Sequence, residues 1–322
     1  MSISLPKYIK NILKYFFILF VLSCEKKIDN SKKSITIERF ENLFYESSID
    51  DLDKLKKKYP YFFPNEFPDS AWENRLKDSI QLEIYEEIKK NYTSLKFLEI
   101  SLYDFFEKHK KLNQDFKEPK IFSIVSDLDF SNRVILNDSI LLIGLDNYLG
   151  PNHHFYEGIP KYIKEDFKRN NIISDVAEKF AKKVIPRNKI YTFLDKIIYN
   201  GKILYYKDFS LGNSLEDRFK IGYSDSKMKW AKDNEYFVWK FFIQNDILFN
   251  PDNKLNNRFI NDAPFSRFYL ELDNKSSEMI GKYIGWQIVI SYMKNNNVNI
   301  LDMIKTDAID IYNNSKYKPN KK

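Results

Sequence analysis

The segment Ala263-Pro264-Phe265-Ser266-Arg267-Phe268-Tyr269-Leu270, together with the helix that its continuation predicts as far as Met293, decides the fold. Turn-forming residues, Asp273-Asn274, interrupt the apolar run after this segment. A helix is predicted to follow them. Ser276 or Ser277 is its expected N-cap, and Glu278 lies in the first turn, where the helix dipole favours a carboxylate.

Two glycines indicate how the predicted helix packs. Gly281 and Gly285 are one turn apart, which leaves a notch where another helix can approach closely. A helix predicted at residues 224–249 has a broad apolar stripe and is the expected partner. Lys282 and Lys294 argue against a membrane span, so we expect tight packing inside a folded domain. The apolar face consists of Ile280, Tyr283, Ile284, Ile288 and Tyr292.

Composition predicts a globular chain with a large aromatic core. The 322 residues are 43% hydrophobic and include 27 Phe and 22 Tyr, enough for one large core or two modest ones. The formal net charge of +7 equals the number of lysines at the two ends, so the chain between them is close to neutral. We find no basic stripe with interleaved aromatics, and therefore expect no nucleic-acid partner. These terminal lysines are Lys7, Lys10, Lys14, Lys316, Lys318, Lys321 and Lys322.

The N-terminus has the organisation of a bacterial signal peptide. A lysine-rich region precedes the apolar stretch 15–22, and Ser23-Cys24 follow at once. Eight residues of helix cover about 12 Å, which is too short to span a hydrocarbon core of about 30 Å. The sequence Val21-Leu22-Ser23-Cys24 resembles the lipobox of bacterial lipoproteins, although Leu22 stands where a small residue is more usual.

Cys24 is the only cysteine, and we interpret it as a lipidation site. The alternative is a buried thiol, but the residues after Cys24 are those of a solvated tether. Acyl chains on this residue, palmitate among them, would anchor the mature protein in a membrane. No second cysteine is available for a disulfide. The predicted organisation is a signal peptide at 1–23, a tether at 24–34, a globular domain at 35–312 and a basic disordered tail at 313–322.

The globular region is predicted to be a single α+β domain, mostly helical, with a small antiparallel sheet. Alternating or apolar runs predict the strands, and three-and-four spacing predicts the helices. The expected strands cover residues 35–40, 121–125, 134–136 and 140–143, the last two forming a hairpin. The expected helices cover residues 50–58, 72–91, 94–112, 159–168, 174–184, 190–206, 224–249 and the glycine-notched segment.

Residues able to support catalysis or metal binding are few. His109 lies among lysines on a predicted exposed helix end, and the adjacent His153 and His154 should point apart in any regular element. A zinc site needs three or four converging ligands, so we expect no metal and no cofactor. Asp127 and Asp129 are better explained as turn caps than as cation ligands. No nucleophile elbow, phosphate-binding glycine loop or His-Glu-x-x-His motif occurs.

An aromatic turn and three Asp-Ser-apolar triplets are the remaining candidates. Packing is the favoured role of the turn formed by Tyr59, Tyr61, Phe62 and Phe63, and a surface that binds a protein, glycan or peptide is the alternative. The triplets resemble the O-glycosylation acceptors of some gliding bacteria, although the first two also fit helix caps. Their serines are Ser70, Ser79 and Ser139.

Several passages in order resemble the gliding-motility lipoprotein GldB family. They are IERF at 37–40, LKKKYPYFFP at 55–64, ILLIGLDNYLG at 140–150, IIYNGKILY at 197–205, APFSRFYLELD at 263–273 and IGWQIVISYM at 284–293. The resemblance covers about residues 35–317. It implies a cell-envelope lipoprotein needed for gliding, a process linked in such bacteria to the type IX secretion apparatus. Its expected partners are the membrane and other envelope proteins of the gliding machinery.

The helical half also resembles zinc-dependent peptidases, which implies a degenerate zincin-like fold. In those enzymes a His-Glu-x-x-His helix precedes a second helix that supplies a glutamate ligand within a Glu-Gly pair. Here the helix at 174–184 has no histidine, and Asn200 precedes Gly201 where that glutamate would stand. An amide is a poor replacement for a charged zinc ligand, so the resemblance implies a pseudoenzyme.

Three hypotheses follow from the sequence. The first is a non-enzymatic lipoprotein, anchored in the cell membrane or outer membrane and facing the periplasm, that acts through protein contacts without a small-molecule substrate. The second is an envelope hydrolase with a metallopeptidase-like fold. The third is a lipoprotein that binds cell-wall glycan or peptide through the aromatic turn.

Overall fold

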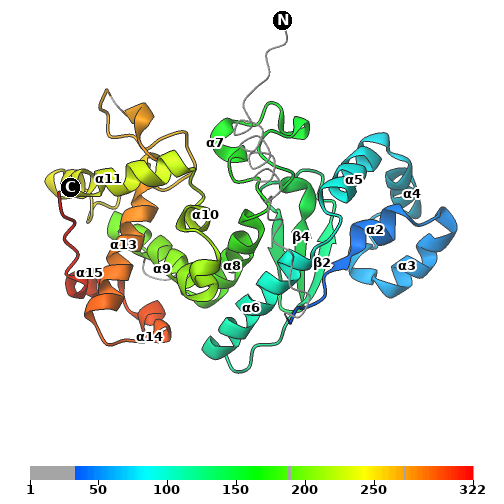
Figure 1. The fold of residues 1–322 in the computed structure, drawn as a ribbon, viewed down its shortest axis with the longest axis horizontal. Helices are drawn as coiled ribbons and strands as arrows, with labels where there is room; N and C mark the ends of the chain where they lie inside the picture. Colours follow the sequence, from blue (N-terminus) through cyan, green and yellow to red (C-terminus); the bar gives the residue numbers. More distant parts are fainter. Residues whose placement is uncertain (1–32, 188–189, 272, 322) are drawn as a thin grey trace, which may run out of the picture. The chain divides into compact units, whose positions relative to one another are not determined.

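The computed structural model describes residues 33–187, 190–271 and 273–321, and Cys24 and the predicted signal peptide lie outside them. Ser34–Lys322 forms one compact unit. Figure 1 shows helices surrounding a small sheet near β2 and β4. The prediction of a mostly helical α+β domain is confirmed.

The sheet is mixed rather than antiparallel, so this part of the prediction was wrong. In the described residues its order is β1 (Glu38–Arg39), β2 (Lys120–Ile124), β4 (Ile140–Gly144) and β3 (Val134–Leu136). The predicted β3–β4 hairpin is present, but β4 also pairs in parallel with β2, and β2 with β1. The apolar run of β4 suits a central strand that is covered on both faces.

One face of the sheet is covered by aromatic side chains from the N-terminal helices. Phe122 of β2 packs in a cluster with Phe40, Phe44, Tyr59 and Phe63.

A single helix was predicted at residues 72–91, but Asp78 ends one helix and caps the next, accepting hydrogen bonds from the N–H groups of Ile80 and Gln81. The N-terminal helices are α2 (Phe40–Tyr45), α3 (Leu52–Lys58), α4 (Asp69–Lys77) and α5 (Ser79–Asn91), and the last of them also contributes Ile84 and Ile88 to the main core.

The opposite face of the sheet belongs to the main core. Ile121, Leu141 and Ile143 point into it and are 5% exposed or less. The helices α6 (Lys96–Leu112) and α8 (Asn171–Val184) contact each other, and α8 packs against β3. This arrangement places the N-terminal half of α8 beside the strand that follows Arg133.

The glycine pair fits a very close helix crossing, as the sequence predicted. Gly285 of α13 (Ile280–Asn295) lies against the backbone of α9 (Phe193–Leu211), where Gly201 meets it in return. These helices make the most extensive helix contact in the described chain, and Figure 1 shows orange α13 beside α9. The expected partner, the helix at 224–249, does contact α13, but α9 fills the glycine notch, because it supplies a glycine of its own at the crossing.

Two further boundaries differ from prediction. Helix α13 begins after Met279, in the left-handed region at φ 50°, so Ser276 and Ser277 do not cap it. The prediction of disorder from residue 313 was wrong for its first residues. Helix α15 (Ala308–Ser315) includes three of them, and the Tyr317 hydroxyl donates a hydrogen bond of 2.9 Å to Glu235. Apolar contacts with Trp239 hold the Tyr317 ring in place.

The remaining elements complete the unit. The α-helices are α7 (Lys161–Lys164), α10 (Asp217–Ile221), α11 (Asp225–Gln244), α12 (Lys254–Phe259) and α14 (Ile300–Lys305). The 3-10 turns are η1 (Ile49–Asp51), η2 (Pro60–Phe62), η3 (Leu145–Asn147), η4 (His154–Tyr156), η5 (Gly212–Ser214) and η6 (Asp273–Lys275). No helix in the described part of the chain is both long and apolar enough to cross a bilayer.

Candidate functional site

Helix α8 carries a polar face that turns away from the core. Asn171, Ser174, Asp175, Glu178 and Lys182 recur at three-and-four spacing, so they share one side of the helix. They line a cavity of about 400 Å³. The intervening residues Ile172, Ile173, Val176, Ala177, Phe180 and Ala181 are buried in the main core. Helix α8 therefore positions a row of polar groups against an open volume.

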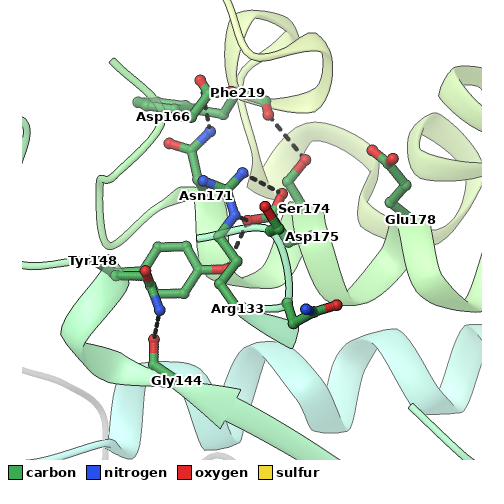
Figure 2. A network of polar contacts seen from close by, with 12 residues as sticks. Arg133, Gly144, Tyr148, Asp166, Asn171, Ser174, Asp175, Glu178 and Phe219 are labelled. Carbon is green, nitrogen blue, oxygen red and sulfur yellow. Dashed lines mark hydrogen bonds and ion pairs between the residues drawn. The ribbon is translucent and has the colours of Figure 1, made fainter. Parts of the chain in front are cut away.

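Asp175 is held by a bidentate pair with Arg133. The two Arg133–Asp175 contacts measure 2.8 Å to Oδ2 and 3.2 Å to Oδ1. The Tyr148 hydroxyl donates a further hydrogen bond of 2.7 Å to the Asp175 Oδ2 atom, as Figure 2 shows. The Arg133 guanidinium also lies over the Tyr148 and Phe167 rings, at 5.4 and 5.7 Å from their centroids. Arg133 and Asp175 thus satisfy each other and fix one wall of the cavity.

Glu178 is paired with two lysines. Lys207 of α9, whose side chain is 3% exposed, donates to Glu178 Oε2 at 2.8 Å and to the carbonyl oxygen of Lys220 at 2.8 Å. Lys182 donates to Glu178 Oε1 at 2.6 Å. Burial opposes ionisation of Glu178, but Lys207 and Lys182 outweigh it and lower its pKa well below the usual range. Glu178 is therefore an ionised carboxylate neutralised by protein cations.

Asp166 and Asn171 form the opposite end of the site. Asn171 is 2% exposed and its Nδ2 donates a long hydrogen bond of 3.4 Å to Asp166 Oδ1, visible in Figure 2. The Asn171 Oδ1 atom has no donor among the described residues. Burial raises the pKa of Asp166 to about 7, and Arg133 counteracts this only in part. Gly222, at φ 84°, lets the backbone approach Asp166, because a Cβ there would lie 2.5 Å from Oδ2.

The cavity combines both signs of charge in nearly equal number. Its described cationic side chains are Arg133, Lys179, Lys182, Lys207, Lys220 and Lys282. Its described acidic side chains are Asp166, Asp175, Glu178, Asp262 and Glu278. Aromatic and aliphatic groups such as Phe130, Phe167 and Met279 form the rest of the lining. This lining suits a small ligand that carries both charges better than one of a single sign.

The resemblance to zinc-dependent peptidases concerned the sequences of α8 and α9. Within the described ranges, no group of three or more His, Cys, Asp or Glu side chains is placed to hold a metal ion. Asn200 donates its amide to the carbonyl oxygen of Lys196 in its own helix, and it is not part of the cavity lining. Gly201 faces α13.

The predicted interaction surface is mostly buried. Tyr59 and Phe63 are 3% and 8% exposed, and the Phe62 ring stacks on Phe40 with the centroids 3.8 Å apart. Only Tyr61 among the four, at 41%, is substantially exposed. The surface prediction was therefore wrong for Tyr59 and Phe63, because these rings fill the space between the sheet and the N-terminal helices. Packing, the role favoured from the sequence, is confirmed for Tyr59, Phe62 and Phe63.

The histidines also differ from expectation. His109 is 3% exposed rather than solvated, with its Nδ1 2.5 Å from the Tyr206 hydroxyl, and burial lowers its pKa to about 4. The rings of His153 and His154 do not point apart but stack with centroids 4.5 Å apart. Their Nε2 atoms lie 3.2 Å from Glu87 and 3.3 Å from Glu83.

The capping and glycosylation candidates lie on the surface. Asp129 accepts hydrogen bonds from the N–H groups of Ser131 and Asn132, which confirms a turn role. Asp127 instead pairs with Arg75. Ser70, Ser79 and Ser139 are all exposed, and their glycosylation remains a prediction.

The sequence patterns did not predict that the cavity residues come together. Arg133 and Asp175 are 42 positions apart, and Lys207 and Glu178 are 29 apart, so no local motif joins them. The signal that was present is the polar spacing of α8 combined with a lysine, Lys207, on the otherwise apolar side of α9.

The fold and site together define a mostly helical α+β protein with a charged cavity. The family model of gliding motility protein GldB matches residues 23–319, a range that includes Cys24 and all described elements. The chain belongs to this family of gliding-motility lipoproteins, which indicates a membrane-associated envelope protein that takes part in gliding. Comparisons with curated proteins and with solved structures found no match.

Proposed function

We propose that this protein is a lipid-anchored component of the gliding machinery that acts through protein contacts without catalysis. The observation that carries the proposal is the position of Cys24, directly after a lysine-rich and apolar leader and within the residues that match the family. Acylation at this cysteine would tether the globular domain to the cell membrane or the outer membrane, on the periplasmic side. The link to type IX secretion belongs to the same proposal.

Replacing the cysteine tests the anchor. In cells that carry Cys24→Ala, we expect loss of labelled palmitate from the protein, its release from the membrane fraction and loss of gliding. Ser31→Ala, in the same tether, is the matched control and should keep all three properties. Unchanged lipid label on the Cys24→Ala protein would refute the anchor.

The absence of catalysis is tested separately. We expect the purified protein to hold no stoichiometric zinc after dialysis. Zinc that is retained in a one-to-one ratio would overturn the non-catalytic proposal and favour the hydrolase alternative. Crosslinking in living cells, followed by mass spectrometry, should recover envelope proteins needed for gliding. Recovery of cell-wall glycan alone would favour the binding-module alternative.

A further inference from the structure

One end of the charged cavity lacks hydrogen-bond donors. Asn171 is 2% exposed, yet its Oδ1 accepts no hydrogen bond from a described residue. Leaving a buried polar atom unsatisfied costs about 1–3 kcal/mol, so such atoms normally have a partner. The Asp166 carboxylate beside it receives the long 3.4 Å bond from Asn171, and Arg133, the nearby cation, is already held by Asp175. This end is therefore suited to an added cationic donor.

The other end of the cavity offers cations that are weakly engaged. Lys282 lies 3.9 Å from its acidic neighbour Asp262, at the limit of an ion pair, its Nζ contacts the Met279 sulfur at 3.0 Å, and its charge helps to lower the pKa of Glu178. Lys179 forms no ion pair with a described residue and lines the same cavity. In contrast, Lys182 and Lys207 are bound to Glu178. An anionic group of a ligand would find Lys179 and Lys282 available.

The distance between the two ends sets the size of the ligand. Asn171 and Lys179 are eight residues apart on α8, which is about 12 Å along the helix axis. A free amino acid is too short to reach both ends, whereas an extended chain of two or three residues spans about 7–10 Å, and the lysine side chains cover the remainder. A cavity of about 400 Å³ has room for such a chain.

We propose that the cavity binds a short peptide of about two or three residues, with its free ammonium group at Asp166 and Asn171 and its free carboxylate at Lys179 and Lys282. The apolar lining, which includes Phe130, Phe167 and Met279, contacts the peptide side chains. A diamine fits less well, because the cavity already holds six described cations. A phosphate-like anion fits this end less well, because its negative charge would lie beside the Asp166 carboxyl group.

The raised pKa of Asp166, about 7, agrees with this assignment. Burial disfavours the ionised carboxylate, and a ligand ammonium placed beside it would restore the ionised form. The ammonium would also donate to Asn171 Oδ1, so one group satisfies both acceptors.

Calorimetric titration of the purified full-length protein in detergent tests the proposal at neutral pH. The probes are trialanine and alanyl-phenylalanyl-alanine, each also prepared with an acetylated amino terminus and with an amidated carboxyl terminus. We expect saturable binding of at least one free peptide, and binding about tenfold weaker for each of its blocked forms. Putrescine should bind more weakly than that free peptide.

Two variants assign the ends. Asp166→Asn should remove the preference for the free amino terminus, and Lys282→Gln the preference for the free carboxylate. Asp138→Asn, which changes an exposed carboxylate outside the cavity, should leave both preferences intact. The comparison between free and blocked peptides on the unmodified protein stands even where a variant fails to fold. The proposal is overturned by no saturable binding of either peptide, by tighter binding of putrescine, or by an unchanged preference in Asp166→Asn.

Discussion

The crossing of α9 and α13 predicts that Gly285→Ala destabilises the protein strongly. A Cβ built on Gly285 would overlap the Ile197 carbonyl oxygen and lie 2.5 Å from its carbonyl carbon. Carbon atoms pack at about 3.5–4.0 Å, so the two helices would have to separate by about 1 Å or more. The opposing atoms belong to the backbone and cannot rotate away.

The magnitude follows from two opposing effects. Forcing extra volume into a packed interface costs typically about 1–3 kcal/mol and occasionally more, and this crossing belongs at the upper end because backbone meets backbone. Alanine recovers about 1 kcal/mol of helix propensity relative to glycine. We expect a net loss of about 2 kcal/mol in the free energy of unfolding, a substantial part of the roughly 5–15 kcal/mol that stabilises a typical domain.

Guanidinium unfolding followed by tryptophan fluorescence measures this loss. Trp286, next to Gly285, is 2% exposed and donates a hydrogen bond of 2.6 Å to Asp208, so it reports on the same crossing. Lys294→Ala is the matched control on the exposed face of α13 and should stay within about 0.5 kcal/mol of the unmodified protein. The close-crossing argument would be refuted if Gly285→Ala gained stability, as an exposed helix glycine does on replacement by alanine.

Three other predictions concern the aromatic turn and the buried titratable groups. Tyr59→Ala should cost about 3–5 kcal/mol and Tyr61→Ala only about 1 kcal/mol, measured by chemical unfolding, because Tyr59 is 3% and Tyr61 41% exposed. By NMR, the His109 ring should remain neutral down to about pH 4, since burial lowers its pKa; protonation near pH 6.5 would contradict this. Asp166, which faces Arg133, Asp175, Lys207 and Asp262, stays protonated in the folded state up to about pH 7 while the unfolded chain ionises near pH 4. The contribution of Asp166 to the free energy of unfolding therefore falls as the pH rises from about 4 to 7. The Asp166→Asn protein should be more stable than the unmodified protein by about 1–3 kcal/mol at pH 8 and equally stable near pH 4.

Local patterns predicted the parts of the fold that depend on local spacing. The positions of Gly281 and Gly285 indicated a close helix approach, and the β3–β4 hairpin followed from two short apolar runs around a turn. The sequence did not show which helix fills the glycine notch of α13, because the apolar stripe of α11 was also broad enough to pack there. The decisive residue was Gly201 on α9, whose role is visible only when both helices are present together.

Pairings distant in sequence were the parts that could not be predicted. The parallel contact of β2 with β4 depends on which strand edge is free after the hairpin forms, and alternation within each strand carries no such information. His109 was predicted to be exposed because its sequence neighbours are lysines. In the structure its ring lies among Phe105, Phe116 and Phe180, so the side chain follows the buried face of α6.

The candidate site could not be predicted, because the polar residues of α8 form no local ligand motif. Ser174, Asp175 and Glu178 occupy the polar face of this helix, but their partners come from elsewhere in the chain: Phe219, Arg133 and Lys207. An amphipathic helix whose polar face is turned to solvent gives the same sequence pattern. The structure distinguishes the two cases, since Lys207, 3% exposed, pairs with Glu178 on the polar face of α8.

The energetics of this charged network favour a binding role over a stabilising one. Burying Lys207, whose side chain is 3% exposed, against the 36% exposed Glu178 requires mainly the lysine to lose hydration, and apolar side chains of similar volume are often as stabilising or more so. The other helices of this domain pack through aromatic and aliphatic contacts, so apolar side chains could also have filled the position of Lys207 and Glu178. An arrangement that keeps Asn171 Oδ1 unsatisfied beside an open volume adds a further cost. The proposed peptide ammonium would recover the second cost by donating to Asn171 Oδ1, so the peptide titration, rather than a stability measurement, tests what this site is for.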